Sequence, residues 1–441
     1  MRSSVLRGCL VKTVKSLVKQ GYPSKVRLQG WAESVQKFGK FLFVHLDDGL
    51  SDDRIQVVIP KKICSKINVG SAVDICGVWT KSLGAQQTME LFASKCTVVG
   101  KNLAPVRQDV PVSALRKSYP LRIKTRSFIA LLRLRSELNK FCHQFFEKEN
   151  FVHIDAPSLS VNDCEGAGDI FIVQVCFENH KKFFGPNPVY LPVSSQLYLE
   201  AIVSRISKVY TIGTAYRAEV STPRRHLAEF RMLEAEFAFA RDIDHLCDFI
   251  EDLTKFVVYK FQQQSSEAEA LKDFFEADLD QNSALIHSFS NTKNFPRLRF
   301  DEASAILRKN GDLIGPRLSR KNEFYLIDYC KSPLFVTNFP AVRAPFYMSR
   351  SECGKYVENC DLLAPTTGEL VGGSLRERNP DALRSRGCKS SLNWYVELRN
   401  AGHPSSAGFG LGMERFMQTL FGIKNIKDTV AFPRYYMGSY F

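Results

Sequence analysis

Two segments of the chain combine residue types that can hold a nucleotide. In residues 216–220, YRAEV, a cation and an anion stand two positions apart, so Arg217 and Glu219 share one face of a predicted strand. Side by side on the floor of a site, such a pair can bind a phosphate and an ammonium group. A lone Arg-x-Glu pair is more often a surface ion pair, so this segment alone does not decide the function.

The residues that follow extend this charged segment. A loop at 221–225 carries two more arginines, and 227–240, LAEFRMLEAEFAFA, is typical of a strand that returns beside the first. Its carboxylates, Glu234 and Glu236 among them, are costly to bury unless cations or a metal face them. The hairpin is therefore expected to carry paired charges inside the protein, and a surface ladder of ion pairs is the alternative.

The second segment, residues 408–415, has the sequence GFGLGMER. Its glycines recur at every second position and leave one face of a predicted strand without side chains, so a flat ligand can lie against the backbone. Arg415 opens the helix that follows, where a planar guanidinium can stack on an aromatic base while reaching phosphate. Neither a Walker loop nor a Gly-x-Gly-x-x-Gly fingerprint occurs, so a doubly wound nucleotide fold is not expected.

The elements that must position these residues divide into two domains. Residues 26–99 contain five short β-rich runs split by turns, which predicts a five-stranded barrel of the oligonucleotide-binding (OB) type, placed at 21–100. A linker rich in proline and basic residues follows at 101–121. A larger domain occupies 122–441, with inserted helices expected at about 255–330.

One aromatic residue of the barrel is a candidate for stacking on an unpaired base. Phe43 lies close in sequence to Lys37 and Lys40, and such lysines can follow the phosphate backbone of a single strand. Alternation places Phe41 and Phe43 on one face of their strand. Both residues could therefore belong to the barrel core, and the sequence leaves that alternative open.

The larger domain begins with a long helix. Apolar residues from Phe128 to Phe145 keep the three-four spacing of one buried helix face, and the helix is expected to end at 148–150. The segments after it mix strands and helices without a βαβ rhythm. We therefore expect a domain that mixes strands and helices and is not a doubly wound parallel sheet.

The composition indicates a globular protein with a polyanionic partner. The 441 residues include 60 Lys and Arg against 46 Asp and Glu, a net charge of +14, which makes nucleic acid the leading partner. A basic protein addressed to an organelle is the other interpretation. The 12 cysteines form no CxxC pair, and no apolar run reaches the roughly 18 residues of a membrane span, so no membrane association is expected.

The N-terminal segment has the composition of a targeting sequence. The first 32 residues contain seven Lys or Arg and no acidic residue, with apolar residues at helical spacing opposite the lysines. This pattern is typical of a mitochondrial presequence and predicts import into the matrix, with a short targeting segment within 1–20. An ordinary amphipathic first helix is the alternative, and it would suit a cytoplasmic location.

Together, these segments resemble the three signature motifs of class II aminoacyl-tRNA synthetases, most closely those of the asparaginyl-tRNA synthetases. The long helix with the following FVHIDAP is similar to motif one, residues 216–236 to motif two and 408–415 to motif three. Similar stretches at 162–171 and 191–201 extend the resemblance over nearly the whole chain. It implies an α+β chain, in which an anticodon-binding OB barrel precedes a class II catalytic domain with an antiparallel sheet flanked by helices. It also implies a homodimer formed through motif one.

The resemblance also implies a two-step reaction. The carboxylate of asparagine attacks the α-phosphate of ATP, and the asparaginyl group of the adenylate then passes to the 3′ end of tRNA(Asn). Arg217 would be a catalytic residue that stabilises charge at the α-phosphate, and Arg225 with His226 would approach the distal phosphates. Phe230 would stack on the adenine, and Arg415, the second catalytic arginine, would close its other side.

Acidic residues complete the ATP site that the resemblance implies. Glu219 lies in motif two and would be a further ATP-binding residue. Asp361 and Glu369 resemble the family's acidic pair for Mg²⁺, a hard cation that bridges phosphates through a few carboxylates and waters.

The resemblance assigns the choice of amino acid to a few side chains. Arg376 matches the arginine directed at the side-chain carbonyl of the substrate, and Glu165 and Gln196 match positions that hold its ammonium group. Aspartate enzymes carry a lysine after a similar Gln-Leu-Tyr, whereas Leu199 and Glu200 follow here. Glu200 would accept hydrogen bonds from the amide and repel an aspartate carboxylate. A helix-surface acid is the alternative.

In the barrel, Phe43 and Gln56 match the positions that stack on and read the central anticodon uridine. The chain departs from the family before motif three: residues 404–408 are PSSAG, where a histidine is frequent, so the role of that histidine does not transfer. The alternatives are an aspartyl-tRNA synthetase, a catalytically inactive synthetase-like RNA-binding protein, and an asparagine-making amide ligase, which would lack the barrel.

Overall fold

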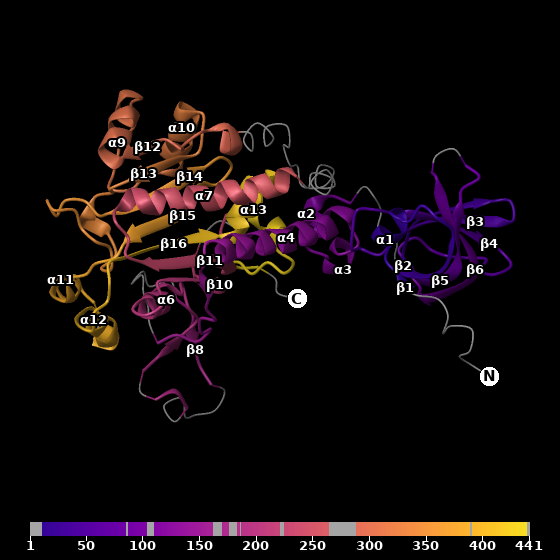
Figure 1. The fold of residues 1–441 in the computed structure, drawn as a ribbon, viewed down its shortest axis with the longest axis horizontal. Helices are drawn as coiled ribbons and strands as arrows, with labels where there is room; N and C mark the ends of the chain where they lie inside the picture. The colour runs from indigo at the N-terminus through magenta and orange to yellow at the C-terminus, as the bar shows by residue number, and fades with distance from the viewer. Residues whose placement is uncertain are drawn as a thin grey trace. The chain divides into compact units, whose positions relative to one another are not determined.

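The chain divides into two compact units, one built on a barrel and one on a large sheet, and each is described by itself (Figure 1). The structure, a computed structural model, describes residues 11–84, 87–103, 110–161, 170–175, 183–185, 187–220, 225–263, 288–388 and 390–438.

The N-terminal unit is a closed β-barrel. Its elements are β1 (Val11–Lys12), α1 (Val14–Val18), β2 (Ser24–Phe38), β3 (Phe41–Asp47), β4 (Ile55–Pro60), β5 (Ala72–Lys81) and β6 (Met89–Gly100). The strands follow the order β1-β2-β3-β4-β6-β5, and a further pairing of β2 with β5 closes the sheet on itself. β4 pairs with β6 in parallel. The predicted five-stranded barrel is confirmed, with β1 added as a short parallel partner of β2.

The barrel core is filled from alternate positions of its strands. On β3, Leu42, Val44 and Leu46 are 0% exposed, whereas Phe41 and Phe43 between them are only half-buried. Successive side chains of a strand point to opposite faces, so both phenylalanines lie on the outer face of the barrel. The alternative in which they fill the core is excluded.

Helix α1 packs into the barrel. Val14 and Leu17 are fully buried in the same apolar cluster as the strands. The side chain of Thr13 caps the helix by accepting a hydrogen bond from the backbone N–H of Ser16. Val14 and Leu17, two of the N-terminal apolar residues at helical spacing, are therefore part of the barrel core. Residues 1–10 lie outside the described part of the chain.

The larger unit is built on an eight-stranded sheet in the order β12-β13-β14-β15-β16-β11-β10-β7. Its strands are β7 (Val152–His153), β10 (Lys208–Tyr216), β11 (Glu229–Ala238), β12 (Arg297–Arg299), β13 (Leu334–Thr337), β14 (Asn359–Ala364), β15 (Gly368–Leu375) and β16 (Ser406–Gly412), while β8 (Ile172–Val173) and β9 (Val189–Tyr190) pair separately.

The described residues after the barrel contain α-helices on both sides of the unit boundary at Leu134. They are α2 (Val112–Leu115), α3 (Tyr119–Arg122), α4 (Arg126–Lys148), α6 (Gln196–Val203), α7 (Ile243–Gln262), α9 (Phe300–Lys309), α10 (Arg320–Cys330), α11 (Pro380–Ser385), α12 (Asn393–Asn400) and α13 (Met413–Phe421). Helix α2 lies within the segment predicted as a linker, 101–121, and α3 extends one residue past it, to Arg122. Both helices belong to the N-terminal unit.

The sheet is mixed, where the family resemblance implied an antiparallel one. The central pairings are antiparallel, but β12 pairs with β13, and β7 with β10, in parallel. A parallel pair needs a crossover connection, and α9 and α10 supply one between β12 and β13. Residues 297–330 of the expected insertion thus form a sheet edge and its covering helices, and residues 264–287 lie outside the described ranges.

The two faces of the sheet have different surroundings. A Cβ at Gly373 would meet Leu246 of α7, whereas a Cβ at Gly372 would face the carboxylates of Asp361 and Glu369. Neighbouring residues of a strand point to opposite faces, so α7 covers one face, as Figure 1 shows where it lies across β14 and β15. The acidic side chains occupy the other face, where the site lies.

The predicted long helix is α4, and it ends where expected. Its last residue is Lys148, and Asn150 adopts a positive φ of 62°, which breaks the helix before β7 pairs with β10. Among the described residues, no helix has both the length and the apolar character needed to cross a bilayer.

Truncating an inward side chain of β3 should cost more stability than truncating its outward neighbour. Leu42→Ala removes a fully buried side chain and should lower the free energy of unfolding by about 2 to 5 kcal/mol. Phe43→Ala should cost less than half of that. Chemical denaturation of the full chain, followed by tryptophan fluorescence, compares the two variants, and equal losses would contradict the outward orientation of Phe43.

Candidate active site

The floor of the site is formed by β11 and β16. Glu236 lies opposite Gly408 in the ladder, and Glu234 lies opposite Gly410. A Cβ at Gly408 would collide with the carboxylate of Glu236, so the glycine makes room for a buried acid. The side-chain-free face predicted for residues 408–412 therefore exists. At Gly408 it makes room for the carboxylate of Glu236, and at Gly410 and Gly412 it lines the cavity.

A cavity of about 630 Å³ opens over this floor. Most residues predicted for the site line it, and they come from α6, the loop between β10 and β11, β11, β14, β15 with the residue after it, and the start of α13: Gln196, Arg217, Glu219, Arg225, His226, Phe230, Asp361, Glu369, Arg376 and Arg415. Glu200 is buried beneath its wall, and Glu165 lies outside the described residues.

At one end of the cavity, side chains of motif two gather beyond the end of β10. The strand stops at Tyr216, so Arg217 and Glu219 lie past it, whereas the sequence placed them on a strand face. The backbone N–H of Arg217 still donates to Ala228, 3.0 Å away, which keeps the hairpin closed. The two side chains remain together, with Arg217 Nη1 and Glu219 Oε1 3.9 Å apart.

His226 and Phe230 flank this pair. His226 Nδ1 lies 3.1 Å from Glu219 Oε2, and the guanidinium carbon of Arg217 lies 5.7 Å from the centre of the Phe230 ring. Burial lowers the pKa of His226, and Glu219 opposes that shift. An exposed arginine, Arg225, completes a cationic end of the cavity that suits phosphates, and Phe230 supplies an aromatic surface.

Carboxylates of β14, β15 and α10 converge beside these cations. Asp361 Oδ1 and Glu369 Oε1 both approach the space above Gly372, at 3.6 and 3.4 Å from a Cβ built there. Burial raises the pKa of Asp361 well above its usual range, and the charges of Glu369 and Glu323 add to the shift. Arg415 Nη1 donates to the backbone carbonyl of Glu369 at 2.9 Å and lies 3.7 Å from its carboxylate.

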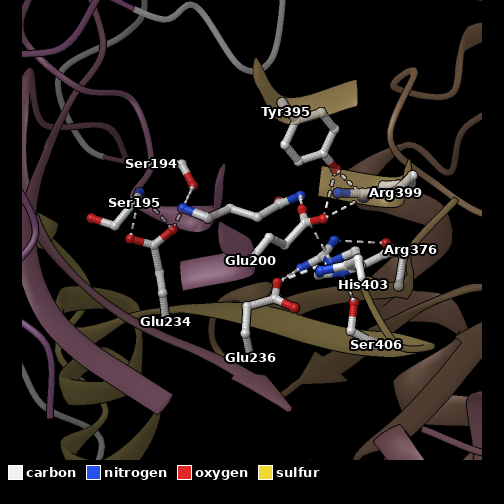
Figure 2. Close-up of polar contacts among 12 residues, drawn as sticks. Ser194, Ser195, Glu200, Glu234, Glu236, Arg376, Tyr395, Arg399, His403 and Ser406 are labelled. Atoms are coloured by element: carbon white, nitrogen blue, oxygen red, sulfur yellow. Dashed lines mark hydrogen bonds and ion pairs between the residues drawn. The ribbon is translucent and has the colours of Figure 1, made fainter. Parts of the chain in front are cut away.

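At the other end, buried charges are paired (Figure 2). Arg376 Nε donates to Glu236 Oε1 at 2.9 Å, Nη2 donates to the same oxygen, and Nη1 donates to Ser374 Oγ at 2.8 Å. Burial raises the pKa of Glu236 to about 8, although Arg376 works in the opposite direction. The side chains of Arg376 and Glu236 are no more than 4% exposed. A ligand group reaching Arg376 would therefore meet a fixed, dehydrated guanidinium.

Glu200 stands behind this pair, 0% exposed. Its Oε1 accepts from Gln196 Nε2 at 2.8 Å and lies 3.7 Å from Arg376 Nε. Its Oε2 accepts from Tyr395 Oη at 2.6 Å and from Arg399 Nη2 at 2.8 Å. The alternative of a helix-surface acid is excluded. A direct contact with a substrate amide stays a prediction, because two cavity-lining side chains, Gln196 and Arg376, stand between Glu200 and the cavity.

The start of α6 is held by Glu234. Its carboxylate accepts from Ser194 Oγ at 2.5 Å and from the backbone N–H of Ser195 at 2.9 and 3.0 Å (Figure 2). A carboxylate at a helix N-terminus is favourably placed. Because Gln196 gives its Nε2 to Glu200, its acceptor atom Oε1 is the one available to an ammonium or amide group in the cavity.

Sequence reasoning missed Glu323, Tyr395 and Arg399 as members of the site. The only local signal for the last two was their spacing of four, which puts both side chains on one face of α12. The cost of burying Glu234 and Glu236 predicted that both need partners. In the structure, Glu234 binds the N-terminus of α6, and Glu236 pairs with Arg376.

A polar bridge adjoins the segment that departs from the family, residues 404–408. His403 Nδ1 lies 2.8 Å from Ser204 Oγ, and His403 Nε2 lies 3.2 Å from Ser406 Oγ. Burial lowers the pKa of His403 to about 4, and Arg399 adds to the shift, so the imidazole is neutral at pH 7. This neutral ring joins the end of α6 to β16 beside the buried charges, as Figure 2 shows for His403 and Ser406.

In the barrel, the two predicted base-contacting residues lie on the same outer face. Phe43 and Gln56 are half-buried on the adjacent strands β3 and β4. Gln56 Nε2 donates to Glu90 Oε2 at 3.0 Å, and Ser82 Oγ donates to the same oxygen at 2.9 Å. Glu90 thus fixes the orientation of the Gln56 amide.

Comparisons with known proteins agree with this geometry. Residues 113–436 match the family described as tRNA synthetases class II (D, K and N), and residues 26–99 match the OB-fold nucleic acid binding domain. The chain is 37% identical to the asparaginyl-tRNA synthetase of Mus musculus, over 93% of this chain and 90% of that protein. It is 32% identical to the asparagine–tRNA ligase of Mycoplasma genitalium, over 97% and 98% of the two chains.

A solved structure shares the fold across both units. The asparaginyl-tRNA synthetase of Pyrococcus horikoshii complexed with asparaginyl-adenylate is 28% identical, with a TM-score of 0.83 over 95% of this chain and 96% of that chain. The matching barrel, the class II catalytic domain and the identity to relatives over nearly the full length lead to one conclusion: the chain belongs to the asparaginyl-tRNA synthetases of the class II tRNA synthetase family.

Proposed function

We propose that this protein attaches asparagine to tRNA(Asn) in an ATP-dependent reaction that passes through asparaginyl-adenylate. One observation carries the proposal: a single cavity joins a cationic end, where Arg217, Arg225 and His226 gather, to an end where Arg376 is fixed between buried carboxylates. The first end suits the phosphates of ATP and the second a small polar amino acid. Relatives named for this activity cover nearly the whole chain.

The first step is activation of the amino acid. The α-carboxylate of asparagine attacks the α-phosphorus of ATP, a C–O–P linkage forms, and pyrophosphate leaves. Arg217 stabilises the charge that develops on the α-phosphate, while Phe230 and Arg415 enclose the adenine and Glu219 orients Arg217 and His226. Positioning and electrostatic stabilisation suffice for this chemistry, so no covalent enzyme intermediate is needed.

Recognition of asparagine takes place over Arg376. Its guanidinium donates to the side-chain carbonyl of the substrate, and Gln196 Oε1 accepts from the ammonium or amide groups, with Glu165 as a further ammonium partner. In the second step, a ribose hydroxyl at the 3′ end of the tRNA attacks the activated carbonyl, and AMP leaves. The barrel holds the anticodon, with Phe43 stacked on a base and Gln56 reading its edge.

The carboxylates at the cationic end fit a divalent ion. The oxygens of Asp361 and Glu369 meet above Gly372, and burial, together with the charges of Glu369 and Glu323, raises the pKa of Asp361, so a bound cation would favour its ionised form. We infer that Asp361 and Glu369 hold Mg²⁺ there. When bound, the ion neutralises part of the phosphate charge.

Assembly and location are further parts of the proposal. A homodimer formed through motif one is supported by the family resemblance and by the position of β7 at the edge of the sheet, where Val152 is 46% exposed. A mitochondrial location is supported by the seven basic residues among the first 32. Because Val14 and Leu17 belong to the barrel core, cleavage beyond them would remove core side chains.

The activity is tested by ATP–pyrophosphate exchange on the full chain without tRNA. We expect exchange with asparagine and not with aspartate or lysine, and Arg217→Ala should lower kcat by roughly 10²- to 10³-fold. Arg384→Met, at a side chain 53% exposed on α11, is the matched control. Exchange with aspartate alone would assign the chain to that substrate, and no exchange by a folded, ATP-binding protein would favour the RNA-binding alternative.

The acidic pair is tested by its effect on the Mg²⁺ requirement. Asp361→Asn and Glu369→Gln each remove one charge from the carboxylates, so the Mg²⁺ concentration that gives half-maximal exchange should rise by about tenfold. Asp328→Asn, at a side chain 78% exposed on α10, should leave it unchanged. An unaltered Mg²⁺ dependence in both active-site variants would refute the assignment.

The barrel is tested by separating tRNA binding from activation. Phe43→Ala removes a stacking surface, so the KM for tRNA in aminoacylation should rise by roughly tenfold while exchange stays at the parental rate. Tyr22→Ala changes a different aromatic residue of the barrel unit, one that is 66% exposed, and serves as the control. If both variants keep the parental KM, Phe43 does not contact the anticodon.

A further inference from the structure

We propose that Arg399, acting with Tyr395 from α12, is the positioning residue that sets the choice of asparagine over aspartate by fixing Glu200 as an ionised partner of Arg376. The inference rests on the proposed function and assigns to α12 a role in specificity. Arg399 does not line the cavity, so it acts through another side chain.

Arg399 binds one carboxylate oxygen of Glu200. Its Nη2 donates to Glu200 Oε2 at 2.8 Å and to Tyr395 Oη at 2.7 Å, and the tyrosine hydroxyl donates in turn to the same Glu200 oxygen at 2.6 Å (Figure 2). The side chains of Arg399 and Glu200 are 1% and 0% exposed. The three groups form a closed, dehydrated triangle, in which each hydrogen bond is strengthened by a charge.

The guanidinium is itself held in place. Its Nε donates to the backbone carbonyl of Glu377 at 3.0 Å, and its carbon lies 4.1 Å from the centre of the Tyr395 ring. Tyr395 and Val396 are at most 1% exposed in an apolar cluster that also contains Leu383 and Tyr347. Helix α12 therefore presents Arg399 from a packed element, and the guanidinium position is set by the fold.

The other carboxylate oxygen of Glu200 contacts side chains that line the cavity. Glu200 Oε1 accepts from Gln196 Nε2 at 2.8 Å and lies 3.7 Å from Arg376 Nε, and these two partners line the cavity. Arg399 thus determines both the orientation of Glu200 and the field that its charge exerts at Arg376. An aspartate side chain brought to Arg376 would be repelled by that negative charge, whereas the neutral amide of asparagine would not.

The charges around Glu200 explain how Arg399 favours its ionised form. Burial works to raise the pKa of Glu200, and Arg399, followed by Arg376, outweighs it, so the pKa is lowered. Without Arg399, Arg376 alone would face both Glu200 and Glu236, and Glu200 would take up a proton more readily. The charged and titratable groups around Glu200 are Arg376 after β15, Glu236 on β11, Tyr395 and Arg399 on α12, and His403 before β16.

The test compares Arg399→Met with Arg399→Lys, and uses Arg384→Met on the neighbouring helix as the control. ATP–pyrophosphate exchange is measured with asparagine and with aspartate over about pH 6 to 9. In Arg399→Met, the KM for asparagine should rise and the preference for asparagine should fall, each by about tenfold or more, most strongly at the acidic end. The KM for ATP should stay parental, and Arg399→Lys, which keeps the charge, should restore part of the preference.

A purely structural role predicts a different result. If Arg399→Met keeps the parental preference and pH profile, as Arg384→Met should, the proposal is overturned. If Arg399→Met fails to fold, the double variant Glu200→Gln/Arg399→Met decides, because it removes both buried charges: it should fold and discriminate poorly, and full discrimination would refute the proposal. Parental protein that shows no exchange with asparagine would refute the proposed function itself, which separates the two failures.

Discussion

The ion pair between Arg376 and Glu236 is the constraint on which the rest of the catalytic unit depends. Both side chains are almost fully buried, and two charges removed from water cost several kcal/mol each unless geometry and further hydrogen bonds compensate. Compensation requires Ser374 beside the guanidinium and a glycine, Gly408, across from Glu236. The register of β11 against β16 and β15 is therefore fixed by electrostatics as well as by apolar packing.

The same constraint divides the cavity into two ends with different electrostatics. At the end around Arg376, charges of opposite sign alternate and are dehydrated, so a ligand is selected by how well it fits an existing pattern. At the cationic end, Arg217 is partly exposed and Arg225 is exposed, so both can follow a flexible polyanion. A rigid end and an adaptable end in one cavity suit a reaction in which positioning carries the catalysis.

Periodicity predicted much of this molecule, and its limits have physical causes. Alternation located the barrel strands and placed Phe41 and Phe43 on one face, but only the burial of Leu42 and Val44 showed that this face is the outer one. The pattern of motif two gave the charges of Arg217 and Glu219 but not the end of β10 at Tyr216. The contact between Arg399 and Glu200 could not be predicted from the pattern, since the two residues are separated by 199 positions.

The polar groups that the fold leaves unsatisfied show what the ligands contribute. Within the described residues, Glu236 Oε2 is buried without a hydrogen-bond donor, and the pKa values of Glu236 and Asp361 are both raised by burial. Each acid lines the cavity, one at each end. A cationic group that binds beside either acid relieves its cost of ionisation. The burial of these acids therefore favours ligands that bring a cationic group to them.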